Sequence, residues 1–167
     1  MSNNPSILAL DPATKCGWAL WRDSQLQSGT WDLSVRKDES QAFRLVRFQN
    51  KLDEVGHIDF LFFEAAGLTR FKRAAQVAGQ LEGVFLPWAH NSGIPYISVK
   101  PTELKKWATG KGNVGKPKMI AASCRKTGYV GSDDDEAEAR LILLWGALTY
   151  LPGEQRRLFE AEWQKLL

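Results

Sequence analysis

The sequence predicts an α/β protein in which one mixed, five-stranded sheet is flanked by helices on both faces. Short, nearly continuous apolar runs alternate along the chain with longer segments of helical periodicity. Three strand-like segments come first, and two more each follow a helical segment, which is the order of a mixed sheet. The length of 167 residues suits one domain with a proper core, so residues 1–167 are expected to form a single domain.

Five segments have the composition of strands. Ser6–Asp11 and Ile58–Glu64 are short apolar runs that end in an acid, which is typical of strands buried on both faces. Cys16–Arg22 and Gln25–Leu33 are rich in β-forming residues, which predicts a meander with a polar turn between them. Pro95–Val99 is expected to be the last strand.

Apolar residues at three- and four-residue steps predict helices in most of the remaining chain. The glycine-rich segment Thr109–Gly115 is expected to be a loop. A last amphipathic stretch carries Phe159, Trp163 and Leu166, which are expected to cover the core rather than bind a partner. The other predicted helices are Lys37–Val55, Thr69–Asn91, Pro101–Ala108, Pro117–Lys126 and Asp134–Thr149.

The composition excludes several classes of protein. No apolar run approaches the roughly 18 residues of a transmembrane helix, so no membrane partner is expected. The start of the chain lacks the basic region and apolar stretch of a signal peptide, so we expect a cytoplasmic protein. Cys16 and Cys124 lie far apart without CxxC spacing, and this predicts neither a disulfide framework nor a zinc site.

The charges are unevenly distributed, although the net charge is only +3. Between Lys100 and Lys126 there are eight Lys or Arg residues and one acid, whereas Asp133–Glu138 holds five acids in six residues. Basic clusters around a compact acidic spot suit an enzyme that cleaves phosphodiesters, since cations hold the backbone and carboxylates hold metal. Solvated helix faces are the alternative interpretation. A second basic cluster consists of Arg70, Lys72 and Arg73.

Two of the predicted strands end in a carboxylate, Asp11 in one and Glu64 in the other. Ligand sites of open α/β sheets lie at the carboxyl ends of the strands, so these two acids are candidate metal ligands. Unpaired carboxylates at a buried edge are unfavourable, and a hard divalent cation is one way to compensate them.

The helix that starts near Asp134 supplies the third part of the candidate site. Its apolar stripe, extended backwards, passes through Glu138 and then Asp135 or Asp134, because residues three or four apart share a helix face. Helix capping explains Asp133 and Asp134 equally well, but it explains Glu138 poorly. The stripe consists of Leu141, Ile142, Trp145 and Leu148.

Five segments together resemble the RuvC-type Holliday-junction resolvases, which have an RNase H-like fold. The resemblance runs from about Ile7 to Ala147 and is closest in appearance to bacteriophage-encoded members. The matching segments are an opening strand and turn, a second acidic strand, a Gly-Gln-x-x-Gly helix, a basic Lys-Gly-rich stretch and a final acidic helix. In order, they read ILALDPATKCGWAL, FEAAG, QVAGQLEGV, SVKPTELKKWATGKGNVGKPKM and DDEAEARLILL.

The resemblance implies an endonuclease that resolves four-way DNA junctions as a homodimer. It implies two Mg²⁺ ions, for which Mn²⁺ can substitute, held by an acidic tetrad, with Lys100 and Lys116 beside the scissile phosphate. The family more often has Asp at the position of Glu138, and its junction-probing aromatic aligns with Gly67, so that Leu68 or Phe71 is left for that role. The implied tetrad is Asp11, Glu64, Asp135 (or Asp134) and Glu138. The expected DNA-binding residues are Arg70, Lys72, Arg73, Lys100, Lys105, Lys106, Lys111, Lys116 and Lys118.

Alternative functions remain at this point. A broader branched-DNA endonuclease or an RNA:DNA hybrid nuclease would carry the same metal site. A non-catalytic scaffold of the same fold would be marked by loss of the carboxylates, which are all present. Gly110–Lys116 satisfies the P-loop pattern, but Pro117 stands where Ser or Thr must bind Mg²⁺, so no nucleotide cofactor is expected.

Overall fold

A computed structural model, which describes residues 4–66 and 72–167, contains the expected mixed sheet of five strands. The strand order is β3-β2-β1-β4-β5; β1 is antiparallel to β2 and parallel to β4, which is parallel to β5. The fold class predicted from the sequence is therefore confirmed. The strands are β1 (Ile7–Asp11), β2 (Lys15–Arg22), β3 (Gln25–Asp32), β4 (Phe60–Glu64) and β5 (Tyr96–Val99). The helices are α1 (Ala42–Val55), α2 (Lys72–Asn91), α3 (Pro101–Thr109), α4 (Lys116–Thr127), α5 (Asp134–Tyr150) and α6 (Gly153–Trp163).

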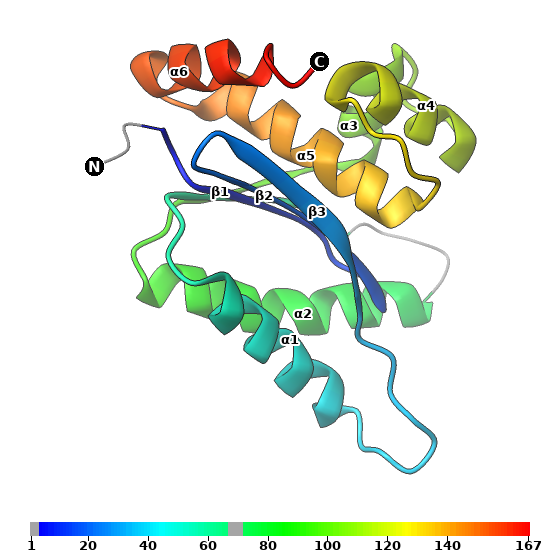
Figure 1. The fold of residues 1–167 in the computed structure, drawn as a ribbon. Coiled ribbons are helices and arrows are strands. Elements are labelled where there is room, and N and C mark those ends of the chain that lie inside the picture. Colours follow the sequence, from blue (N-terminus) through cyan, green and yellow to red (C-terminus); the bar gives the residue numbers. More distant parts are fainter. Residues whose placement is uncertain (1–3, 67–71) are drawn as a thin grey trace.

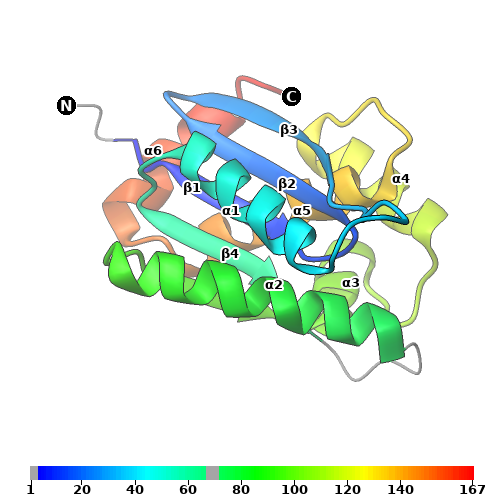
Figure 2. The same ribbon diagram turned by 90° about the horizontal axis from the view of Figure 1, so that it is seen from below.

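Helices cover both faces of the sheet (Figures 1 and 2): α1 and α2 lie on one face, and α5, with α3, α4 and α6, lies on the other. Successive side chains of a strand point to opposite faces. In β1, Ile7 and Ala9 therefore pack toward α5, whereas Leu8 and Leu10 pack toward α1 and α2. This alternation separates two hydrophobic cores, and it decides which face each strand-end residue reaches.

Two glycines let α5 lie directly against the sheet. A Cβ atom on Gly17 of β2 would be 2.0 Å from the backbone oxygen of Asp135, at the start of α5. A Cβ atom on Gly146, in the second half of α5, would be 2.3 Å from the ring of Phe62 in β4. Both contacts are far shorter than van der Waals distance, so any side chain at either position would push α5 away from the sheet.

The apolar surface of α5 is wider than the single stripe predicted from the sequence. Leu143, Leu144 and Ala147 are buried as well, whereas Leu148, which belongs to the predicted stripe, is only partly buried. The reason is that α3, α4 and α6 cover the side of α5 that faces away from the sheet. A helix that is apolar on all sides is expected where neighbours surround it.

The first helix begins later than predicted, at Ala42 rather than Lys37. The preceding residues form a turn in which Glu39 accepts a hydrogen bond from the backbone N–H of Arg36 and pairs with Arg47. Phe43 and Val46, two apolar residues of the helix predicted over Lys37–Val55, are about half exposed, at 49% and 55%. The buried face of α1 is formed instead by Arg44, Phe48, Leu52 and Val55.

The end of the chain covers the core as expected, except at its last residues. Phe159 and Trp163 of α6 are buried and pack against Trp21 of β2. Leu166 lies beyond the helix and remains 45% exposed, so the prediction was wrong for this residue. In the described parts of the chain, no helix has both the length and the apolar character needed to cross a membrane.

We predict that Gly146→Ala destabilises the fold by about 1–3 kcal/mol, because the added methyl group overpacks the contact with Phe62. Urea unfolding followed by tryptophan fluorescence measures this change. Gly153→Ala is the matched control, since a Cβ atom there meets nothing within 4 Å, and its stability should change by less than about 1 kcal/mol. Equal stabilities of the two variants would show that α5 has room to shift.

Candidate active site

The parallel pairing of β1 with β4 brings two acids to one edge of the sheet. Leu10 pairs with Phe63, so Asp11 and Glu64 are the next residues on the two adjacent strands. Asp11 has the same orientation as Ala9, and Glu64 has the same orientation as Phe62, so both carboxylates lie on the α5 face. Strand alternation alone therefore directs these acids toward the start of α5.

The first two turns of α5 add further acids at the same place. Asp133 caps the helix, because its Oδ1 atom accepts hydrogen bonds from the backbone N–H groups of Asp135 (2.9 Å) and Glu136 (3.1 Å). Glu138 lies one turn further along, and its carboxylate lies among those of Asp11 and Glu64: one oxygen from each forms a group within 4.8 Å.

These acids line an open cavity of about 750 Å³. Asp134 and Asp135 also line it, but their carboxylates form a second group with that of Asp133, again within 4.8 Å of one another. Three of the four tetrad residues predicted from the sequence are thus brought tightly together, and Asp135 lies beside them in the same cavity. The other walls of the cavity are Pro12–Lys15, Ala65, Ala66, Ala74, Ala75, Ala78, Pro101, Lys105 and Lys116.

Burial and mutual repulsion make these carboxylates hard to ionise. Burial raises the pKa of Glu64 to about 8, and the negative charge of Glu138 adds to the shift. The pKa of Asp11 is also well above its usual range, first because of burial and then because of Glu64, Glu138, Asp135 and Asp134, in decreasing order. Burial likewise raises the pKa of Glu138, and it raises that of Asp135 to about 6.

The same residues fit a divalent cation. The Oε2 atom of Glu64 is buried and has no hydrogen-bond partner among the described residues. A buried carboxylate oxygen without a partner is unfavourable, and a cation with several carboxylate ligands would compensate it. Carboxylate oxygens are the ligands that Mg²⁺ and Mn²⁺ prefer, so the donor set suits these ions.

Three lysines line the cavity, Lys15, Lys105 and Lys116, and of these Lys116 alone belongs to the pair expected beside the scissile phosphate. Lys105 of α3 lies near enough for its charge to lower the pKa of Glu64 and Glu138. Lys116 lines the cavity as expected and pairs with Asp134. Lys100 precedes the first residue of α3, is exposed and does not line the cavity.

Apart from Arg70, which is not among the described residues, the other predicted DNA-binding residues lie outside this cavity. Lys72 and Arg73 are exposed at the start of α2, and Lys106 is exposed on α3. Lys111 and Lys118 line a second hollow of about 310 Å³, which they share with Thr109, Val114, Ala121 and Arg125. Arg70 lies outside the described residues, as do Gly67, Leu68 and Phe71.

Sequence reasoning missed the polar network that holds the start of α5. The hydroxyl group of Tyr129 donates to the backbone oxygen of Asp133 (3.1 Å) and accepts from its N–H group (3.0 Å). Ser28 of β3 donates to Glu136, and Arg140 donates to the backbone oxygen of Thr127. No pattern in the sequence signals this network, because it depends on how the segment before α5 folds back on the helix and on a contact between Ser28 and Glu136, which are 108 positions apart.

The glycine-rich segment does not have the setting of a P-loop. Gly110–Lys116 joins α3 to α4, whereas a P-loop joins a strand to a helix. Gly110 has φ = 81° and ends α3 in the left-handed conformation that glycine favours. The segment is therefore a helix-to-helix connection beside the carboxylates.

We predict that, in the presence of a chelator, the stability of the protein falls as the pH rises from about 4.5 to 8. The folded state holds the Glu64 proton up to about pH 8, whereas the unfolded state loses it near the usual value of 4.5, so stability present below pH 4.5 is lost over this window. Urea midpoints at half-unit pH steps measure the slope. Glu64→Gln should flatten it and the exposed-site control Asp38→Asn should not; a flat wild-type profile would contradict the prediction.

The chain has clear relatives in sequence and in structure, although no family model matches it. It is 31% identical over 146 residues to the crossover junction endodeoxyribonuclease RuvC of Anaeromyxobacter sp. (strain Fw109-5), covering 79% of this chain and 68% of that protein. It is 29% identical over 150 residues to the protein of the same name from Anaeromyxobacter dehalogenans, covering 81% of this chain and 77% of that protein.

Solved structures show the same fold. Thermus thermophilus RuvC, in complex with a Holliday junction substrate, matches with a TM-score of 0.68 and 18% identity, covering 95% of this chain and 96% of that chain. The yeast mitochondrial Holliday junction resolvase matches with a TM-score of 0.54 and 15% identity, covering 98% of this chain and 86% of that chain. With its sheet order, its acidic cluster and these sequence relatives, the chain belongs to the RuvC family of crossover junction endodeoxyribonucleases.

Proposed function

We propose that this chain is a metal-dependent, structure-specific endonuclease that resolves four-way DNA junctions, and that residues 1–167 act as one nuclease domain. The observation that carries the proposal is the grouping of Asp11, Glu64 and Glu138 within 4.8 Å in an open cavity edged by lysines. Membership of the RuvC family supports it, because the relatives are named crossover junction endodeoxyribonucleases.

The acidic residues have distinct positions in the proposed mechanism. Asp11, Glu64 and Glu138 form the inner group, and Asp135 is the fourth ligand. We assign Asp135 rather than Asp134 as this ligand for two reasons. The charge of Asp135 raises the pKa of Asp11 more than that of Asp134 does, and Asp134 already pairs with Lys116. These four acids would hold two Mg²⁺ or Mn²⁺ ions, whose positive charge would lower the pKa of a bound water and would stabilise negative charge on the leaving 3′ oxygen.

Two lysines of the cavity have a separate part, which is to hold the phosphate that is cut. Lys105 and Lys116 approach the carboxylates from α3 and α4, so their ammonium groups can bind the non-bridging phosphoryl oxygens. Removing Lys105 would leave the carboxylates in place, but the negative charge on the phosphoryl oxygens in the transition state would lose a stabilising cation. The family resemblance implied Lys100 together with Lys116, and the position of Lys100 outside the cavity favours Lys105 in its place.

The substrate also suggests how the protein is assembled. A four-way junction has near two-fold symmetry and must be cut in two strands, so we propose a homodimer with one site for each strand. The outer side of α2 is the proposed interface, since α2 buries Val77, Leu81, Phe85 and Ala89 against its own chain and leaves the opposite side exposed. A bacteriophage origin and a cytoplasmic location in the host complete the proposal.

The proposed function is tested on a panel of labelled DNAs in the presence of Mg²⁺. We expect paired, symmetric nicks in a four-way junction, and an intact linear duplex and RNA:DNA hybrid. Asp11→Asn should abolish cleavage while the affinity for the junction stays within about threefold, because one inner carboxylate is lost and the basic surface remains. Equal cutting of flaps and three-way junctions would instead indicate a general branched-DNA endonuclease, and no cutting of any substrate would favour a non-catalytic scaffold.

The two candidate phosphate lysines can be separated by a matched pair of variants. Lys105→Met should lower the cleavage rate of the bound junction roughly 100-fold, because a charge next to the reacting phosphate is lost. Lys100→Met removes the same charge outside the cavity and should lower the rate less than about fivefold. Single-turnover cleavage at saturating protein measures both, and the reverse order of effects would restore Lys100 to the role.

A further inference from the structure

One cation of the cavity has no part in the proposed mechanism. Lys15 is the first residue of β2, directly after the turn that follows Asp11, and it lines the same cavity as the carboxylates. Its side chain is 53% exposed, so it is accessible from solvent. Lys15 stands within the first segment of the family resemblance, but neither that segment nor the charge clusters gave it a role.

Strand alternation fixes the face on which Lys15 lies. Cys16 is buried among the α1 and α2 side chains, so its neighbours Lys15 and Gly17 belong to the opposite, α5 face. Gly17 lies directly beneath the backbone oxygen of Asp135. Lys15, two residues earlier, is therefore beside the first turn of α5, and its positive charge is among those that act on Asp135.

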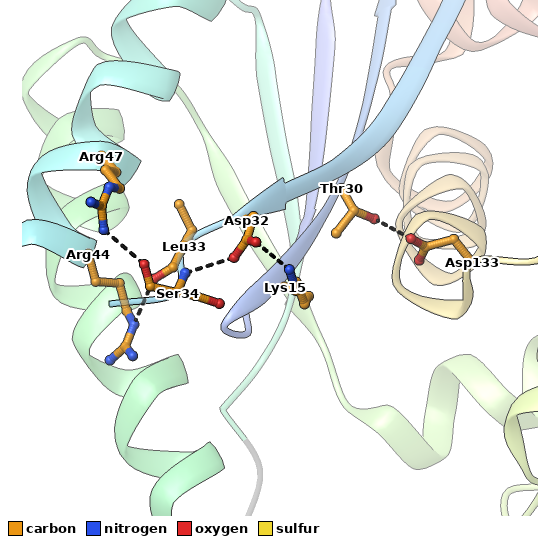
Figure 3. A network of polar contacts seen from close by, with 8 residues as sticks. All are labelled: Lys15, Thr30, Asp32, Leu33, Ser34, Arg44, Arg47 and Asp133. Atoms are coloured by element: carbon orange, nitrogen blue, oxygen red, sulfur yellow. Dashed lines mark hydrogen bonds and ion pairs between the residues drawn. The ribbon is translucent and has the colours of Figure 1, made fainter. Parts of the chain in front are cut away.

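Lys15 has a resting partner that a stronger anion can replace. It pairs with Asp32, the residue opposite it in the β2–β3 ladder (Figure 3). Both side chains are more than half exposed, at 53% and 58%. Exposed ion pairs contribute only about 0–1 kcal/mol, so a DNA phosphate can take the place of Asp32 at little cost.

The surrounding contacts hold this pair at a defined position. Asp32 also accepts a hydrogen bond from the backbone N–H of Ser34 (2.9 Å), and the backbone oxygen of Ser34 accepts one from Arg47 of α1 (2.8 Å). On the other side, Thr30 of β3 donates to Asp133 at the start of α5 (3.1 Å). The end of β3 is thus joined by hydrogen bonds to helices on both faces of the sheet, and Lys15 pairs with Asp32 at this end, beside the cavity.

Lys15 and Lys105 reach the cavity from opposite directions along the strand order, although both lie on the α5 face of the sheet. Lys15 belongs to β2, on one side of β1, whereas Lys105 lies in α3, which follows β5 on the far side of β4. We propose that Lys15 leaves Asp32 and binds a backbone phosphate of the cleaved strand next to the one that is cut. Lys105 would then hold the scissile phosphate while Lys15 holds its neighbour in the same strand. This inference rests on the proposed function, since it takes DNA as the ligand.

The test measures affinity for a synthetic four-way junction over a series of salt concentrations, in the uncleaving Asp11→Asn background. Lys15→Gln should weaken binding about three- to tenfold near 0.1 M salt, and it should reduce the slope of log K against log salt by about 0.9, the loss of one phosphate contact. Lys51→Gln is the matched control, because Lys51 also forms an exposed pair, with Glu54, but lies on α1. Its slope should stay unchanged.

Asp32→Asn, alone and combined with Lys15→Gln, completes a double-mutant cycle. If Asp32 competes with phosphate for Lys15, Asp32→Asn should tighten binding about threefold when Lys15 is present and should have little effect in the Lys15→Gln background. Thermal melting of each variant checks that the fold is retained, as both side chains are exposed. Lys15→Gln with an unchanged slope, or an equal effect of Asp32→Asn in both backgrounds, would overturn the inference. Equal affinity for junction and linear duplex would overturn the proposed function instead, and the cycle would still be read on the duplex.

Discussion

The direct contact between α5 and the sheet is the constraint on which the site depends. Because Gly17 and Gly146 have no side chains, the helix reaches the sheet at both ends of its length without a spacing layer. The distance between α5 and the sheet decides whether the carboxylate of Glu138 lies within 4.8 Å of those of the two strand-end acids, Asp11 and Glu64. Wider spacing of the helix would leave a similar core but would separate the carboxylates.

The carboxylates themselves oppose the fold when no cation accompanies them. Each is at least partly buried, and the charges of other acids raise their pKa values further, so the ionised cluster stores repulsion in the folded state. The rest of the site limits this repulsion without removing it: Lys105 acts on Glu64 and Glu138, and Lys116 pairs with Asp134. The arrangement favours a cation that binds several carboxylates at once, and it gives metal binding a direct link to stability.

Much of the fold and the acidic part of the site could be predicted from the sequence, but the positions of the lysines could not. Strands that end in Asp11 and Glu64 and a helix that carries Glu138 follow from local periodicity, because each pattern lies within one element. The positions of the lysines do not, because they depend on how α3 and β2 sit against α5. Nothing in the sequence distinguishes Lys100 from Lys105, and the fold shows that Lys100 lies outside the cavity whereas Lys105 lines it. Lys15 was missed for the same reason.

The site is assembled from parts that lie far apart along the chain, from Asp11 near the beginning to Glu138 in the fifth of six helices of the described chain. During synthesis, the two strands that carry Asp11 and Glu64 leave the ribosome long before α5 does. A nascent chain of about 130 residues would hold half of the acidic cluster and none of the helix that completes it. The topology therefore delays the appearance of the complete acidic cluster until α5 has been made.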